Sequence, residues 1–169
     1  MTDDLVAMAR TIIDTNSYLT LATADPDGKP WATPVWFAPD GHTGFIWLSR
    51  PTTRHSTNIS GRPEVAIVVF DSTVPIYQGN AVYVDAVAEQ VPAAEIDAAV
   101  AVYSARSVAH GDRTWQVADV VEPAEFRLYR ARAVTQYVLD AHDSRVAVDL
   151  GPVPAENAIR AAQAACSYS

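Results

Sequence analysis

Two short turns with the same sequence constrain the fold of this chain more than any other feature. Pro-Asp-Gly occurs at residues 26–28 and again at 39–41. In each turn the proline presets φ and the glycine supplies a positive φ. These turns separate segments 18–24, 31–38 and 44–49, whose alternating apolar and β-branched residues predict strands. Strands joined by such tight connections pair antiparallel, so the first third of the chain is expected to be a β-meander.

The rest of the chain adds more strands and a few helices. Further strands are predicted at 64–71, 77–91, 126–132, 134–139 and 146–150, and helices at 3–15, 51–60 and 92–106. The strand at 64–71 is apolar enough to be buried on both faces, Gly79 suggests a bulge, and Pro34 suggests an edge or a bulge. No regular alternation of strands and helices occurs, which argues against a parallel sheet. We expect a mainly β protein with flanking helices, built as a small closed or split barrel over residues 1–150, and a C-terminal tail at 151–169 with some helix.

Charge and cysteine content exclude several classes of function. The 169 residues include 12 basic and 20 acidic ones, a net charge of −8, which argues against nucleic acid or an anionic membrane as partner. A single cysteine, Cys166, cannot form an internal disulfide, and no CxxC or HExxH motif suggests a metal. The N-terminus lacks the basic start of a signal peptide, and no apolar run reaches the ~18–20 residues of a membrane span. We therefore expect a soluble, cytoplasmic protein without a metal.

The basic residues are concentrated in one window. No acidic residue occurs between Asp40 and Glu64. That window contains Arg50, Arg54, Arg62, His42 and His55, for a formal charge of +3. The predicted helix at 51–60 begins inside it, and the free N–H groups of a helix N-terminus bind anions. Residues 49–55 can therefore cradle a phosphate monoester, with the Arg54 guanidinium as a bidentate donor; the alternative is a solvated helix start.

Several segments resemble one known family. Residues 19–30 (LTLATADPDGKP) with 32–37 (ATPVWF) resemble the opening of the pyridoxamine 5′-phosphate oxidase-like split-barrel family. Residues 47–55 (WLSRPTTRH) with 58–66 (NISGRPEVA) resemble its phosphate-binding segment. Shorter matches are found at 78–81 and 126–128, so the resemblance extends over roughly residues 15–140.

The resemblance implies a six-stranded split β-barrel that forms a homodimer and binds FMN, or the deazaflavin F420, at the dimer interface. The positions that match the cofactor phosphate segment are Thr53, Arg54 and His55, with Leu48 and Ser49 leading into it. The positions that match the strand beside the isoalloxazine are Thr33, Pro34, Val35 and Trp36. Many family members carry Lys or Arg where this chain has His55. Because histidine is only partly charged at pH 7, phosphate affinity is expected to be weaker or pH-dependent.

The function that follows is a flavin-dependent oxidoreductase that transfers hydride to or from a small organic substrate. No Ser-His-Asp set or carboxylate pair is evident, and Asp85 with Glu89 is better explained as a solvated strand face, so no catalytic residue is assigned. The alternatives are an F420-dependent reductase, a non-catalytic flavin- or haem-binding protein with His55 or His110 as axial ligand, and a cofactor-free interaction module. Residues that bind pyridoxal substrates could not be placed, which argues against vitamin B6 oxidation.

Overall fold

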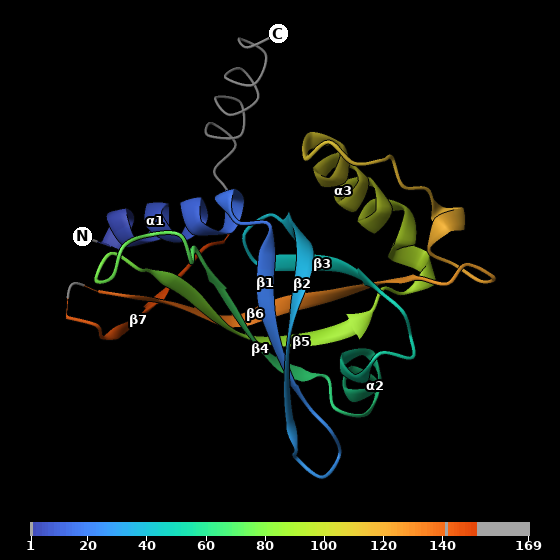
Figure 1. Cartoon of the computed structure of the whole chain (residues 1–169), viewed down its shortest axis with the longest axis horizontal. Coiled ribbons are helices and arrows are strands. Elements are labelled where there is room, and N and C mark those ends of the chain that lie inside the picture. The colour runs from blue at the N-terminus through green and yellow to red at the C-terminus, as the bar shows by residue number, and fades with distance from the viewer. Residues whose placement is uncertain (1, 141, 152–169) are drawn as a thin grey trace, which may run out of the picture.

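The computed structural model describes residues 2–140 and 142–151 (Figure 1). Apart from Gly151, the tail expected at 151–169 lies outside the described residues. The helices are α1 (Thr2–Thr15), α2 (Arg54–Gly61) and α3 (Ile96–Ala109). The strands are β1 (Tyr18–Ala24), β2 (Pro30–Asp40), β3 (Gly44–Ser49), β4 (Glu64–Phe70), β5 (Ala81–Gln90), β6 (Arg127–Leu139) and β7 (Arg145–Val148). Short 3-10 turns lie at Ala93–Glu95 and Val117–Asp119.

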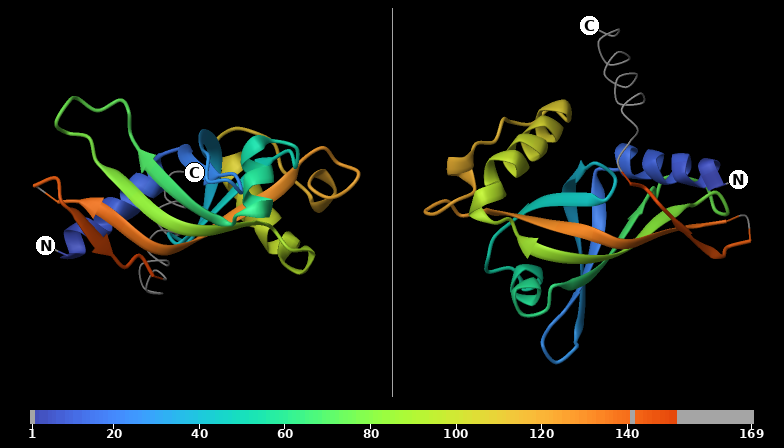
Figure 2. Two further views of the ribbon diagram at one scale, coloured as in Figure 1. Left: turned by 90° about the horizontal axis from the view of Figure 1, so that it is seen from below. Right: turned by 180° about the vertical axis from the view of Figure 1, so that it is seen from behind.

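The strands form an antiparallel sheet that closes on itself. The strand order is β3-β2-β1-β4-β5-β6-β7, and an additional pairing of β3 with β6 joins the sheet into a ring of six strands. Strand β7 extends β6 outside this ring. Helices α1 and α2 lie at opposite ends of the barrel, and α3 packs beside β2 and β3 (Figures 1 and 2). The predicted six-stranded antiparallel barrel with flanking helices is confirmed.

The barrel is split along strand β2. Strand β1 pairs with the whole of residues 30–36, but β3 pairs only with residues 37–40. The Phe37 N–H donates to the Ser17 carbonyl at 3.2 Å, toward β1. Because backbone groups alternate sides along an antiparallel ladder, the nitrogen of Pro34 faces the open edge, where no ladder hydrogen bond is lost. The predicted edge position of Pro34 is therefore confirmed.

The barrel interior holds the main core, and it corrects one expectation. The most deeply buried large side chains include Leu21, Phe37, Phe45 and Trp47. Strand β4 does not lie between two apolar layers as predicted, because its exposure alternates residue by residue along Glu64–Phe70. An antiparallel barrel strand has one interior face, so its other face points outward even where the sequence is apolar.

Several element boundaries also differ from the sequence predictions, among them the following three. Helix α2 begins at Arg54 with Thr53 as its N-cap, so Pro51 lies in the turn before it. Strand β5 begins at Ala81, which leaves Gly79 in the preceding loop. The two strands expected at 126–132 and 134–139 form the single strand β6, whose pairing with β5 skips Val134 as a bulge.

None of the described helices is long and apolar enough to cross a membrane. Within residues 2–140 and 142–151, no group of three or more His, Cys, Asp or Glu side chains could hold a metal ion.

Candidate functional site

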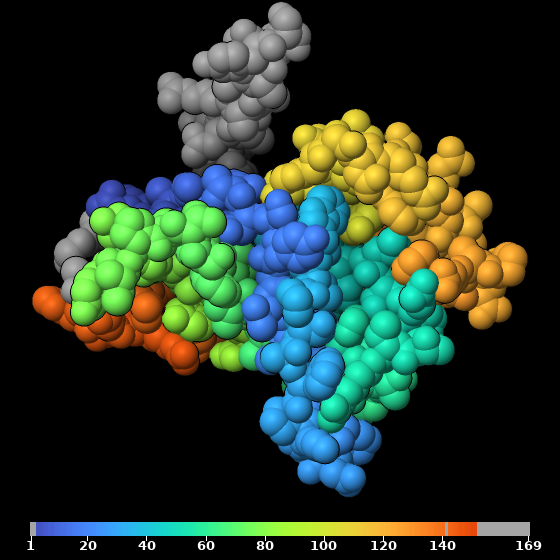
Figure 3. Space-filling model, viewed as in Figure 1, coloured from blue at the N-terminus to red at the C-terminus, as the bar shows by residue number. Residues whose placement is uncertain are grey.

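The end of β3, the start of α2 and the start of β2 meet at one end of the barrel. Two contacts hold α2 against the β1–β2 hairpin, which projects at the lower end of the molecule (Figure 3). The buried Asn58 side-chain amide donates to Thr23 Oγ1 at 2.9 Å, and the Arg62 guanidinium donates to the Pro26 carbonyl at 3.1 Å. These contacts fix the helix so that its first turn lies beside the free edge of β2.

A compact group of polar side chains surrounds the α2 N-terminus. We call Ser49, Thr53, His55 and Ser56 the hydroxyl cluster. Ser49 Oγ lies 2.7 Å from His55 Nε2, and Thr53 Oγ1 lies 3.1 Å from each of these two atoms. Thr53 Oγ1 also donates to Ser56 Oγ at 2.8 Å and accepts from the Ser56 backbone N–H at 3.4 Å. The N-cap of the helix is thus part of the same hydrogen-bond network as the histidine.

His55 is buried at the start of α2. Its residue is only 9% exposed, and burial lowers the pKa of the ring below its usual 6.5. In the absence of a bound anion, burial therefore favours the neutral imidazole. Its contact with Ser49 resembles a nucleophile–base pair. A catalytic triad also requires a carboxylate that hydrogen-bonds the ring, and none does so among the described residues.

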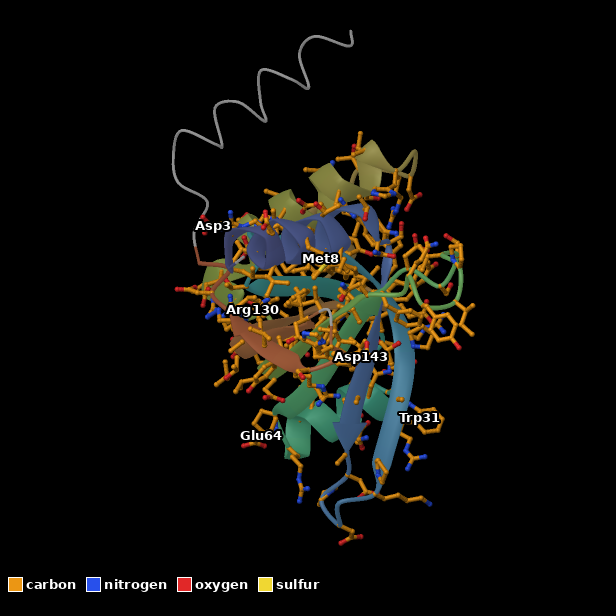
Figure 4. The ribbon with its side chains drawn as sticks, turned by 90° about the vertical axis from the view of Figure 1, so that its left-hand side faces the viewer. Asp3, Met8, Trp31, Glu64, Arg130 and Asp143 are labelled. Atoms are coloured by element: carbon orange, nitrogen blue, oxygen red, sulfur yellow. The ribbon has the colours of Figure 1, made fainter. Side chains whose placement is uncertain are left out.

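Arg54 is the first residue of α2 and supplies positive charge at the start of the helix. Its guanidinium carbon lies 4.5 Å from the centroid of the Trp31 ring, a cation–π contact. Trp31 projects from β2 at the level of α2 and is 40% exposed (Figure 4). In the part of the chain that the structure describes, no carboxylate pairs with Arg54. The guanidinium is thus available to an anion.

The predicted basic window does not form one surface. Arg50 pairs with Glu125 at 2.7 Å, and His42 contacts Asp14 of α1 at 3.1 Å, at the other end of the barrel. The sequence window contains no acid, but the fold brings acids to it from distant segments. Arg54, together with Arg62 at the end of α2, is what remains of the expected patch.

The other predicted site residues are divided among different surroundings. Val35 points into the barrel core, while its neighbour Trp36 packs against α3, with ring centroids 5.3 Å from Tyr103 and 5.8 Å from His110. Pro34 is exposed on the open edge of β2. Thr33 and Leu48 are half-buried, and Leu48 packs in the smaller core beneath α3. What β2 offers to a ligand is thus chiefly its open backbone edge.

The site contains a residue that the sequence prediction did not assign. Trp31 stacks on Arg54 although the two are 23 positions apart, and no local spacing indicates that contact. The only signal was its aromatic character on a strand adjoining the basic window.

Two hollows lie near this end of the barrel. A cavity of about 490 Å³ lies on the face of α2 that carries Ser56 and Ser60, against Glu89 of β5 and Tyr129 of β6. Arg54 and Asn58 lie on the opposite face of the helix, toward β1 and β2. A shallower groove of about 460 Å³ runs over the outer face of β1, β4 and β5.

The six-stranded split barrel is the fold of a known family. Residues 5–139 match the family model described as pyridoxamine 5′-phosphate oxidase, and the chain belongs to this family. A comparison with curated proteins found no match.

Solved structures with the same fold include proteins of different activities. A haem-binding protein from Mycobacterium smegmatis superposes with a TM-score of 0.68 at 20% identity, over 86% of this chain and 57% of that one. HutZ, a haem storage protein from Vibrio cholerae, gives 0.59 at 22% identity, over 76% and 89% of the two chains. A protein described as an F420 reductase gives 0.56 at 20% identity, over 75% and 94%. The chain thus spans little more than half the length of the first neighbour, and these likenesses establish the fold alone.

Proposed function

We propose that this protein is a homodimeric oxidoreductase that binds a phosphorylated flavin, FMN, with its phosphate at the start of α2. The observation that carries the proposal is the Arg54 guanidinium, which has no acidic partner among the described residues and belongs to the first turn of α2, directly after the N-cap Thr53. Membership of the family supports a flavin as the ligand. In a chain with a net charge of −8, a cationic side chain without an acidic partner is unusual.

The donor set suits a phosphate group. Arg54 offers a planar fork of N–H donors, which matches phosphate oxygens in pairs. Of the first backbone N–H groups of α2, that of Ser56 donates to Thr53 Oγ1. Those of Arg54 and His55 have no partner within the helix and point toward its N-terminus, where negative charge is favoured. The hydroxyl groups of Ser49 and Thr53 lie at the same helix start and can donate to a phosphate when their protons are not engaged within the hydroxyl cluster. The open edge of β2 would provide backbone groups for the polar rim of a flat ring system.

When bound, a flavin supplies hydride transfer through its N5 atom, so the protein need not contribute a nucleophile. The part of this chain's residues is to hold the phosphate and to place the ring along β2. No catalytic side chain is assigned, and the proposed substrate is a small organic molecule.

The test is a fluorescence titration of the apo-protein with FMN. Replacing Arg54 with Ala removes a charge-assisted contact worth about 1.5 kcal/mol or more, so the dissociation constant should rise at least about tenfold. Arg113→Ala is the matched control, since Arg113 also stacks on a tryptophan, 3.8 Å from the Trp115 centroid, but lies far from α2 in sequence. Equal FMN affinity of Arg54→Ala and wild type would refute the phosphate assignment.

F420 is the second candidate, and the charge at the site favours testing it in parallel. FMN carries a phosphate monoester, which is close to a dianion at pH 7, whereas the first phosphate of F420 is a diester with one negative charge. Among the described residues, Arg54 is the cation nearest in sequence to Thr53 that has no acidic partner, and burial disfavours the charged form of His55. Tighter binding of F420 than of FMN would assign the chain to the reductase branch.

Haem is less well supported by the side chains present. His55 Nε2 is already engaged by Ser49 and Thr53, and His110 packs edge-on against Trp36. Haem is titrated into the apo-protein in parallel. A Soret band that forms with the wild type and is lost in His110→Ala would indicate that His110 ligates haem, and haem would then replace the flavin in the proposal.

A further inference from the structure

We propose that His55 is a positioning residue whose protonation state decides whether the hydroxyl cluster presents lone pairs or O–H donors to a bound phosphate. This inference rests on the proposed function, because it concerns the same phosphate site. A lysine or arginine at this position would neutralise the phosphate directly with a permanent charge, whereas the proposed role of His55 is to set the direction of the hydroxyl protons.

The first step is to account for the hydroxyl protons when His55 is neutral. The proposal takes the neutral tautomer that carries its proton on Nδ1. Nε2 is then an acceptor, and the short 2.7 Å contact requires that Ser49 donates its proton to the ring. Thr53 has one proton and two acceptors at hand, the Arg50 carbonyl at 3.0 Å and Ser56 Oγ at 2.8 Å. The protons of Ser49 and Thr53 are then both used inside the cluster. Toward a ligand, these two residues present oxygen lone pairs, which repel an anion.

Protonation of the imidazole reverses this arrangement. Both ring nitrogens are donors in the charged form, so Nε2–H donates to Ser49 Oγ. The Ser49 hydroxyl proton is released and can turn toward a phosphate oxygen. One proton added at Nε2 therefore changes what Ser49 presents to the ligand, from an oxygen lone pair to an O–H donor.

The charged groups that the structure describes around α2 each have a contact of their own. On or just after α2 the cations are Arg54, which stacks on Trp31, and Arg62, which donates to a backbone carbonyl. From β5, Glu89 lines the cavity beside Ser56, but Arg130 of β6 binds its carboxylate at 2.7 Å. Tyr129 of β6 lines the same cavity. The pKa of His55 is lowered by burial.

Linkage fixes the direction of the effect. If phosphate binds the protonated form more tightly, bound phosphate must raise the pKa of His55, and affinity must increase as pH falls. The phosphate monoester itself has a second pKa near ~6 and loses charge below it, which acts in the opposite direction. A rise in affinity on acidification is therefore not expected from the ligand.

The experiment measures FMN affinity between pH 8 and 5.5 for the wild type and for His55→Gln, whose amide does not titrate in this range. The wild type should bind FMN about tenfold more tightly relative to the variant at the acid end than at the alkaline end, which corresponds to a His55 pKa raised by about one unit in the complex. Riboflavin, which lacks the phosphate, should show no such divergence. Parallel pH profiles for the two proteins would overturn the inference and leave the proposed function standing.

A second measurement needs no variant. The ring protons of His55 are followed by NMR during a pH titration of the wild type, with and without saturating FMN. A higher pKa in the presence of FMN supports the inference, and an unchanged or lower pKa refutes it. If the wild type binds no FMN at any pH, the proposed function fails, and this inference fails with it.

Discussion

At the scale of single residues, the candidate site depends on how one charged side chain is held. Arg54 is exposed, and a free arginine loses rotamer entropy when it closes on a ligand. Its contact with the face of Trp31 restricts that motion beforehand. The tryptophan is thus expected to act on the ligand through the arginine rather than by direct contact.

Replacing Trp31 with Ala tests this expectation. A cation–π contact at an exposed site is worth about 0.5–1 kcal/mol, so FMN should bind roughly two- to fivefold more weakly. Trp31→Phe, which keeps an aromatic face, should recover most of the affinity. Isothermal titration calorimetry measures both, and a Trp31→Ala protein that binds as tightly as the wild type would show that the stack has no role in binding.

At the scale of elements, the predictions succeeded where local chemistry decides the structure. Gly28 and Gly41 have φ of 85° and 61°, as the two Pro-Asp-Gly turns require, and β1 and β3 have the predicted limits. Prediction failed where distant segments decide. Val134 is a bulge because β6 must follow β5, which no few neighbouring residues encode. The start of α2 is a different case, because its signal is local: Thr53 caps the helix through the Ser56 N–H three residues on, and the prediction placed the start at Pro51 instead.

The candidate site, too, was predicted where its residues are close in sequence and missed where they are far apart. The segment 49–55 brings Ser49, Thr53 and His55 together because they are close in sequence. The partners of Arg50 and His42 come from residues 125 and 14, so the sequence window gave the wrong picture of the charge there. The sequence segment that contains most of the site residues therefore does not predict the charged groups that the fold brings to the site from elsewhere.

The junction between α3 and the barrel gives a pH-dependent prediction at this scale. Arg130, mostly buried on β6, binds Glu89 and Glu95, and its hydrogen bond lowers the pKa of Glu95 from 4.5 to about 2. A carboxyl group whose pKa is lower in the folded state stabilises the fold above its unfolded pKa. That stability is lost as pH falls from about 4.5 toward 2.

Glu95→Gln should therefore be less stable than the wild type at pH 6, and the difference should shrink steadily below pH 4.5. Urea denaturation followed by tryptophan fluorescence at several pH values gives the two curves. Asp97→Asn, which changes an exposed acid in the first turn of α3, is the control. A constant difference between Glu95→Gln and the wild type across this range would contradict the assigned ion pair.

At the scale of the whole molecule, the outer barrel face offers a surface for the proposed homodimer. The shallow groove there is lined by small and apolar side chains, including Ala22, Ala66, Val87 and Val134, together with the carboxylates of Glu64 and Asp85. Val87 is 46% exposed and Val134 70% exposed, which is unusual for valines that lie side by side over a sheet. A second copy of this face would cover them.

Introducing a charge into this groove should break the dimer. Val134→Asp is expected to shift the mass measured by light scattering during size-exclusion chromatography from two chains to one, because an unpaired buried charge is costly at an interface. It should also weaken FMN binding, since the proposed cofactor lies at the interface. Val108→Asp, at a valine 51% exposed on α3, should leave both properties unchanged. A Val134→Asp protein that remains a dimer would exclude this face.

The open stretch of β2 has a consequence for solubility. An unpaired strand edge usually invites pairing with the edge of another molecule, which leads to aggregation. Here Pro30 and Pro34 interrupt the row of donors on that stretch, so an incoming strand cannot form a continuous ladder. The barrel can therefore keep one side open to a small ligand without exposing a template for fibril growth.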